Sequence, residues 1–198
     1  MNLLRISQYF KRFIYVYLTT MPGRYRQKKL RILREMFLKS IDFMNKTGLE
    51  YWLDFGTLLG YHREKGIIPH DIDVDYSMPE EAYDKILRKM DKIPPGFSWY
   101  DTSHRHHGPK IYMNYKGFDI DVYFYKDLGE AVRSTENTSY PNERQDIPKS
   151  LVFPLKEGKH FGQLVKVPNQ VKEYLEYIYG YIGKNGKRDT KTGFWIEA

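Results

Sequence analysis

Acidic and apolar side chains alternate in the segment His70-Asp71-Ile72-Asp73-Val74-Asp75-Tyr76. Alternation with β-branched residues predicts a strand, in which successive side chains point to opposite faces. We therefore expect Asp71, Asp73 and Asp75 to share one face. Carboxylates spaced about 7 Å apart along a strand face repel each other unless a cation compensates them. Oxygen ligands of this kind suit Mg²⁺ or Mn²⁺, which also bind substrate phosphates, so the segment predicts a metal site.

The residues before this segment predict a strand, a turn and a short helix. Apart from Glu50, residues 49–53 are apolar and aromatic, as in a buried strand. Gly56-Thr57 predicts the turn, because glycine lets backbone N–H groups approach a phosphate. Residues 58–66 predict the helix. An isolated Asp-x-Asp pair is explained as well by a solvated edge strand, whereas this order of elements favours a phosphate-handling site.

A second acidic strand is predicted at Phe118-Asp119-Ile120-Asp121-Val122-Tyr123-Phe124. Asp119 and Asp121 share a face by the same alternation. Metal-dependent nucleotidyl transfer typically needs two carboxylates on one strand and a third on a neighbouring strand. The third acid can also help to deprotonate an acceptor hydroxyl. Either Asp119 or Asp121 satisfies this requirement.

Positive charge is concentrated at the start of the chain. The net charge is +7, but residues 1–39 contain ten Lys and Arg residues against one acid, Glu35. The remainder holds 22 basic and 24 acidic residues, so the body is close to neutral. This distribution argues against a nucleic-acid-binding protein. The chain contains no cysteine, which excludes disulfides and thiolate metal sites.

The N-terminal residues 1–25 predict a basic amphipathic helix, because apolar residues recur every three or four positions. No segment reaches the roughly 20 apolar residues of a spanning helix, and no signal peptide stands out. The helix either lies on an anionic membrane surface or packs on the body. Residues 27–46, followed by Gly48, predict a second helix without catalytic features. We expect a catalytic domain at residues 26–182 and a tail at residues 183–198.

Two histidine-containing segments are further candidates for a metal or anion site. His70-Asp71 matches the metal-binding dipeptide of HD-type phosphohydrolases, but those sites lie on helices and this pair opens a strand. The polar residues 104–107, His-Arg-His-His, predict an exposed loop that can face an anionic substrate. Lys110 follows this loop and is a candidate phosphate contact.

The segment Tyr51-Trp52-Leu53-Asp54-Phe55-Gly56-Thr57-Leu58-Leu59-Gly60, followed by Arg63, residues 66–69 and the acidic strand, resembles the signature of the LicD family. That family includes bacterial phosphocholine transferases and the fukutin group of phospho-alditol transferases. Residues 120–123, Ile-Asp-Val-Tyr, resemble its later strand and favour Asp121 over Asp119. Weaker matches continue to residue 182.

The resemblance implies a nucleotidyltransferase-like α/β (α+β) fold with a mixed sheet flanked by helices. It implies a phosphotransferase that uses Mg²⁺ or Mn²⁺ and a CDP-linked donor carrying choline, ribitol, glycerol or ethanolamine. The acceptor would be a hydroxyl of a cell-surface glycan such as lipopolysaccharide, capsule or teichoic acid. Asp73, Asp75 and Asp121 would be the catalytic and metal-binding acids, with Asp73 and Asp75 as the metal pair and Asp121 as the third acid that completes the site. The candidate substrate-binding residues are Asp54, Gly56, Thr57, Arg63, Asp71 and Lys110.

Departures from the family pattern leave the transferred group open. His70 stands where the family usually has Trp, and Ile72 where it usually has an acid. Transfer of the nucleotidyl group itself to a small-molecule or sugar acceptor is an alternative. A non-catalytic, membrane-associated metal- or nucleotide-binding module is an alternative of another class. We expect a cytoplasmic protein, peripheral to the inner face of the membrane.

Overall fold

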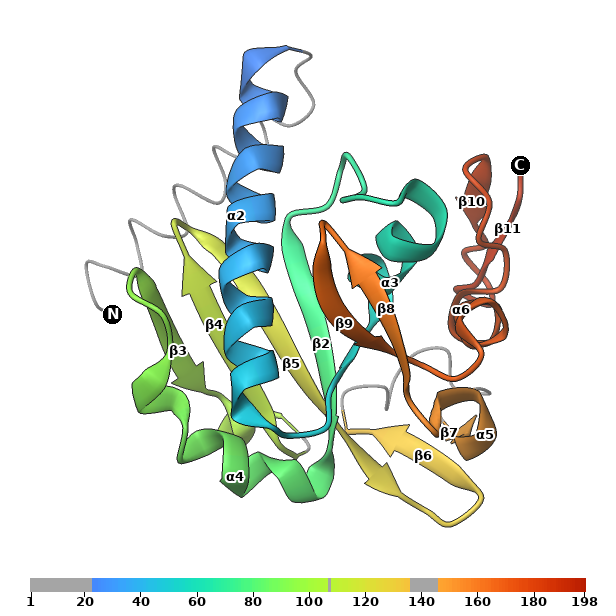
Figure 1. The fold of residues 1–198 in the computed structure, drawn as a ribbon. Helices are drawn as coiled ribbons and strands as arrows, with labels where there is room; N and C mark the ends of the chain where they lie inside the picture. The colour runs from blue at the N-terminus through green and yellow to red at the C-terminus, as the bar shows by residue number, and fades with distance from the viewer. Residues whose placement is uncertain (1–22, 107, 136–145) are drawn as a thin grey trace.

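A computed structural model describes residues 23–106, 108–135 and 146–198. The expectation of a helix at residues 1–25 therefore falls almost entirely outside the described residues. Figure 1 shows a mixed sheet with helices packed on it. This arrangement confirms the expected α/β class. No helix in the described ranges is long and apolar enough to cross a membrane.

The main sheet has seven strands and carries the acidic segments on two neighbouring strands at its centre. The central order is β1-β2-β5-β4-β3, and β6 pairs with both β5 and β7. Only β2 and β5 run parallel; the other pairs in this sheet are antiparallel. Its strands are β1 (Trp52–Leu53), β2 (Asp73–Pro79), β3 (Phe97–Asp101), β4 (Lys110–Tyr115), β5 (Phe118–Asp127), β6 (Ala131–Ser134) and β7 (Asp146–Pro148).

Six helices of the described chain and two hairpins surround the sheet. The helices are α2 (Arg24–Thr47), α3 (Phe55–Leu59), the π-helical segment η1 (Gly60–Glu64), α4 (Tyr83–Leu87), α5 (Lys149–Val152) and α6 (Val171–Tyr179). Short 3₁₀ turns lie at Glu80–Ala82, Met90–Lys92 and Ser103–Arg105. The hairpins are β8 (Lys156–His160) with β9 (Gln163–Val167), and β10 (Gly186–Arg188) with β11 (Trp195–Glu197).

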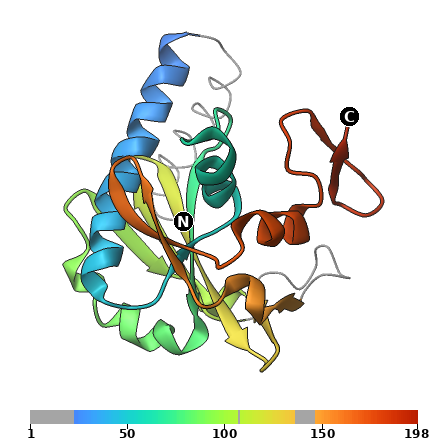
Figure 2. The ribbon, with the colours of Figure 1, turned by 45° about the vertical axis from the view of Figure 1, so that its right-hand side comes forward.

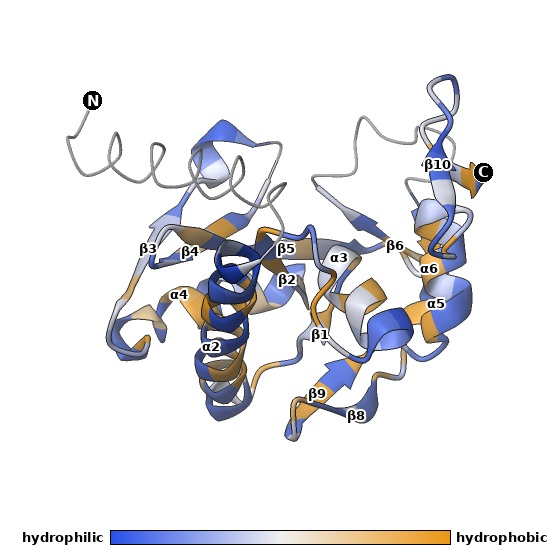
Figure 3. Ribbon diagram, turned by 90° about the horizontal axis from the view of Figure 1, so that it is seen from above, coloured by the Kyte–Doolittle hydropathy of each residue, from blue (hydrophilic) through white to orange (hydrophobic). Residues whose placement is uncertain are grey.

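Helix α2 covers the apolar face of the sheet. Its buried residues are mostly apolar, among them Leu33, Phe37 and Ile41, and Figure 3 shows hydrophilic residues along much of the rest of the helix. Buried Ser40 on this helix hydrogen-bonds to the hydroxyl of Tyr76, which points away from the aspartates of β2. The helix predicted at residues 27–46 is confirmed and begins three residues earlier. Gly48, the predicted stop, caps it in the left-handed conformation with φ 68°.

Three local expectations need correction. Strand β2 begins at Asp73, so Asp71 and Ile72 precede it in a loop. Helix α3 begins at Phe55, because Asp54 caps it, so Gly56-Thr57 lies in the first helical turn. Residues 183–198, expected to be a tail, include the hairpin β10–β11, which projects from the body beyond α6 (Figure 2).

Candidate functional site

The parallel pairing of β2 with β5 brings four aspartates together on one face of the sheet. Asp73 lies opposite Asp119, and Asp75 lies opposite Asp121. Neighbouring strands are about 4.8 Å apart, and paired residues of parallel strands point to the same side. The two acidic segments, more than 40 residues apart in the sequence, therefore form one acidic face opposite the face covered by α2.

Asp75 is the most deeply placed of these four carboxylates. Its side chain is 6% exposed, and its Oδ2 accepts a hydrogen bond from the backbone N–H of Thr57 at 3.4 Å. The Thr57 hydroxyl in turn accepts from the Asp75 backbone N–H at 2.8 Å. Burial, followed by repulsion from Asp73 and Asp121, raises the pKa of Asp75 well above its usual value. The structure thus places Thr57 as a residue that fixes Asp75.

The loop before β2 holds Asp71 beside the acidic face. Lys29, fully buried on α2, donates hydrogen bonds to the backbone carbonyls of Pro69 and Asp71 at 2.9 and 2.8 Å. Burial, with a further contribution from Asp73, raises the pKa of Asp71 to about 7. A Cβ at Gly56 would lie 3.1 Å from Asp71 Oδ2, so glycine permits this close approach.

Asp121 forms a buried ion pair with Lys110. The ammonium lies 2.9 Å from Asp121 Oδ1, and only 1% of the lysine side chain is exposed. The same ammonium lies 3.1 Å from the ring centroid of Tyr123, a cation–π contact. Asp119 is held differently, because Asn114 donates a hydrogen bond to it at 2.7 Å. Lys110, which the sequence predicts as a phosphate contact, therefore forms its ion pair with Asp121, the predicted third acid.

Asp54 lies beneath the site and is fully buried. Its carboxylate accepts hydrogen bonds from the backbone of Phe55 and from the hydroxyls of Ser77, Tyr125 and Tyr174. Burial raises the pKa of this carboxyl group, although the four donors oppose the shift. A direct substrate contact by Asp54 would require this network to open. In the structure, the residue joins α3, β2, β5 and α6.

Arg63 binds the C-terminal part of the chain. Its Nε donates to Glu64 at 2.8 Å, and its NH1 donates to the carbonyls of Ile182 and Gly183 at 3.2 and 3.1 Å. Glu64 also pairs with Lys184 at 2.9 Å. A contact between Arg63 and a phosphate group stays a prediction. The hydrogen bonds give Arg63 a second role as an anchor of residues 182–184.

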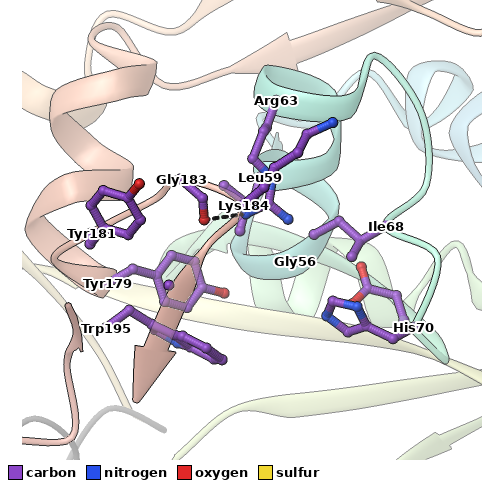
Figure 4. A pocket seen from close by; sticks show the side chains of 12 residues that line it. Gly56, Leu59, Arg63, Ile68, His70, Tyr179, Tyr181, Gly183, Lys184 and Trp195 are labelled. Atoms are coloured by element: carbon purple, nitrogen blue, oxygen red, sulfur yellow. Dashed lines mark hydrogen bonds between the residues drawn. The ribbon is translucent and has the colours of Figure 1, made fainter. Parts of the chain in front are cut away.

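A cavity of about 260 Å³ opens between these elements. Figure 4 shows Tyr179 and Trp195 on one side of it and Ile68 and His70 on the other, with Gly56 between them. Asp71 and Arg63 also line it, so it adjoins the acidic face. Predicted site residues Gly56, Arg63 and Asp71 therefore meet at one cavity, whereas Lys110 and Asp121 lie away from its lining.

The acidic face fits a divalent cation by its chemistry. Within residues 23–106, 108–135 and 146–198, no group of three or more His, Cys, Asp or Glu side chains is preformed to hold a metal ion. Asp73 and Asp75 nevertheless offer oxygen ligands on one strand face, as Mg²⁺ requires. Burial is the main cause of the raised pKa of Asp75, and the neighbouring carboxylates of Asp73 and Asp121 add a negative potential that a cation would relieve.

Sequence reasoning missed Lys29 and Tyr179. Lys29 stands where helical periodicity places it on the buried face of α2, and a lysine in an apolar stripe is the signal that it has a buried partner. Tyr179 lies among the weaker family matches that continue to residue 182, and no local pattern marks it as part of a cavity. Of the polar loop, His104 and Arg105 are exposed and bonded to each other, and residue 107 lies outside the described ranges.

Comparisons with known proteins agree with this architecture. The family described as LicD/FKTN/FKRP, nucleotidyltransferase domain, matches residues 48–170. An uncharacterized protein of Rickettsia typhi, RT0683, is 29% identical over 162 residues, or 78% of this chain and 50% of that protein. Ribitol 5-phosphate transferase FKRP of Mus musculus is 28% identical and covers 76% of this chain and 32% of its own length.

Human ribitol-5-phosphate transferase FKTN is 28% identical over 172 residues, covering 82% of this chain and 34% of that protein. The chain thus spans half or less of the length of these curated relatives. Among solved structures, the lincosamide antibiotic adenylyltransferase LnuA is similar at 12% identity and a TM-score of 0.46, over 80% of this chain and 90% of that one.

Proposed function

Because the chain belongs to the LicD/FKTN/FKRP nucleotidyltransferase-domain family, we propose that it is a phosphotransferase that moves a substituted phosphate group. The donor is a CDP-linked phosphocholine or phospho-alditol such as ribitol 5-phosphate, and the acceptor is a hydroxyl of a cell-surface glycan. The observation that carries this proposal is the pairing of Asp73 and Asp75 with Asp119 and Asp121 across two parallel strands. Curated relatives that are ribitol 5-phosphate transferases support it.

In the reaction, the acceptor hydroxyl oxygen attacks the distal phosphorus of the donor. A new P–O bond forms to the acceptor, the diphosphate P–O bond breaks, and CMP leaves. Asp121 takes the hydroxyl proton on the carboxylate oxygen that Lys110 does not hold; Lys110 binds the other oxygen at 2.9 Å. Mg²⁺ or Mn²⁺, held by Asp73 and Asp75, would neutralise charge on the diphosphate.

The protein contributes mainly positioning and fixed charge. Thr57 orients Asp75 through two hydrogen bonds. Lys29 fixes the loop that carries Asp71, and Gly56 leaves room for the Asp71 carboxylate. These contacts hold the acids before substrate binds, so little reorganisation is needed during the reaction.

The test replaces Asp73 with Asn and measures CMP release in the presence of Mg²⁺. The donors are CDP-choline, CDP-ribitol, CDP-glycerol and CDP-ethanolamine, first ranked by thermal shift with and without Mg²⁺. We expect the rate with the best donor to fall roughly 100-fold or more, because the variant lacks one charge at the metal pair. The fold should survive, since Asp73 is only half-buried.

Asp42→Asn is the matched control, because this carboxylate is exposed and paired with Lys46 on α2. It should keep the wild-type rate and circular dichroism spectrum. Full activity of Asp73→Asn would overturn the metal assignment. Formation of a nucleotidylated acceptor in place of CMP would identify nucleotidyl transfer as the reaction.

A further inference from the structure

The cavity beside the acidic face is lined by two parts of the chain, one inside the residues that match the family and one beyond them. Gly56, Arg63 and Asp71 lie within the residues that match the family, whereas Tyr179 and Trp195 lie beyond residue 170. The second group forms a wall opposite the loop before β2 (Figure 4). The composition of the cavity is therefore set partly by residues that the family signature does not include.

We propose that this cavity binds the pyrimidine nucleoside of the donor, with the base against Tyr179 and Trp195. The proposal rests on the proposed function and assigns the position and orientation of its donor. A volume of about 260 Å³ suits a nucleoside but is small for an entire CDP-linked donor. The remainder of the donor extends past Gly56 and Asp71, which line the same cavity, toward Asp73 and Asp75.

The aromatic side chains supply the surface that a base recognises. Trp195 is 40% exposed, although a large apolar ring is usually covered. Its indole and the ring of Tyr179 lie together on one wall (Figure 4). Flat aromatic faces of this kind stack on nucleobases, which offer a π-face whatever their sequence.

The charged residues of the cavity favour the nucleoside part of the donor over a choline group. Two cations, Arg63 and Lys184, line it and pair with Glu64 behind them, and Asp71 is the one acidic side chain among the lining residues. A quaternary ammonium group prefers aromatic rings without neighbouring cations. A nucleoside that continues into a diphosphate is compatible with this positive charge. The transferred group therefore points away from this cavity, toward the β4 side of the acidic face.

The aromatic wall is held in place by contacts that do not involve the base. Arg63 donates to the carbonyls of Ile182 and Gly183. The backbone N–H of Tyr181 donates to the Trp195 carbonyl at 2.8 Å, and Gly180 forms a β-bridge with Trp195. These bonds position Trp195 over the cavity, so Arg63 acts on the nucleoside through the wall it anchors.

The experiment measures binding of CMP and CDP to the full chain by calorimetry with Mg²⁺. We expect Trp195→Ala to weaken binding of both roughly tenfold through lost stacking, and Trp195→Phe to restore most of the affinity. Trp99→Ala is the matched control, because Trp99 is 36% exposed on the far edge strand β3. Phosphocholine and ribitol 5-phosphate, which lack a base, should bind the wild type and Trp195→Ala equally.

The outcomes separate this proposal from the proposed function. Wild-type affinity of Trp195→Ala for CMP and CDP, or no binding of either nucleotide to the wild type, would overturn the nucleoside site. Trp195-dependent binding of CMP without transfer from any CDP-linked donor would support the site while contradicting the transferase. A fall in the melting temperature of Trp195→Ala alone, with unchanged affinity, would also count against the nucleoside site.

Discussion

Lys110 carries a positive charge into a nearly closed part of the molecule. Its ammonium is bound by Asp121 and by the ring of Tyr123, and 1% of its side chain is exposed. Removing one partner of a buried ion pair leaves the other charge buried without compensation, which is costlier than losing an exposed pair. Around Asp121 this cost is increased by the nearby carboxylate of Asp75.

Replacing Lys110 with Met should therefore lower the free energy of unfolding by about 3–5 kcal/mol. Lys149→Met provides the comparison, because it removes an exposed Lys–Asp pair, with Asp127, and should cost less than about 1 kcal/mol. Urea denaturation at pH 7.5 measures both. Equal losses in the two variants would contradict a stabilising role for the buried pair.

For single residues, the sequence predicts which aspartates share a strand face, but not which side chains form hydrogen bonds and ion pairs around them. Period-two alternation places Asp73 with Asp75, and Asp119 with Asp121, because strand geometry alone fixes their faces. The roles of Asp54, Lys29 and Lys110 depend on side chains from other elements; the Asp54–Tyr174 hydrogen bond spans 120 residues. No local pattern encodes such a partner.

The elements themselves follow their local signals except where a tertiary contact intervenes. Helix α2 is predicted well because its apolar periodicity and its glycine stop agree. The start of β2 is predicted too early, because buried Lys29 binds the carbonyls of Pro69 and Asp71 and keeps this stretch out of the sheet. The hairpin β10–β11 is missed because each of its strands has only three residues and neither alternates apolar with polar residues.

The hairpin β8–β9 packs on α2 through a buried histidine. His160 lies against the rings of Phe37 and Phe161, and burial lowers its pKa from the usual 6.5 to about 4. The unfolded chain binds this proton below about pH 6.5, whereas the folded protein binds it only near pH 4. The contribution of His160 to stability is therefore present above pH 6.5 and is lost as the pH falls toward 4.

His160→Phe should reduce the loss of thermal stability between pH 7.5 and pH 4.5. Phenylalanine keeps the ring contacts and removes the titrating group. His104→Phe, at an exposed position in a 3₁₀ turn, should leave the pH dependence of the wild type unchanged. The melting temperature of each variant is measured across this pH range. If the melting temperatures of the wild type and His160→Phe fall equally with pH, His160 is excluded as a source of acid sensitivity.

Among the described residues, exposed cations gather in the first turns of α2, the end of this helix that lies far from α4 (Figure 1). Between positions 24 and 31 the exposed basic residues are Arg24, Arg26, Lys28 and Arg31; Arg34 is also exposed, and the first acid of the helix is Glu35. This end lies next to the loop of Asp71, because Lys29 joins them. The charge pattern supports the proposal that an anionic membrane surface binds this end and leaves the acidic face accessible.

Replacing the four exposed basic residues between positions 24 and 31 with Gln should weaken binding to vesicles that contain anionic lipid, since each cation near such a surface contributes about 1 kcal/mol. The matched control replaces four cations at the opposite end of the molecule, Lys85, Arg88, Lys89 and Lys92, where Asp84 and Asp91 are interspersed. Vesicle sedimentation at low and high salt measures both. Undiminished binding of the α2 variant would contradict membrane contact through this end.

The hydrogen bonds of Asp54 have a consequence for protein synthesis. The ribosome releases the chain from its N-terminal side, so Asp54 and the aspartates of β2 emerge well before Tyr174. Until α6 arrives, the carboxylate under the site lacks the Tyr174 hydroxyl, and α3 has no helix behind it. A nascent chain that already displays its acidic strand therefore still lacks one of the hydrogen bonds that hold Asp54. The hydrogen-bond network of Asp54 is therefore completed only after the chain has been synthesised beyond Tyr174, the last of its four donors in the sequence.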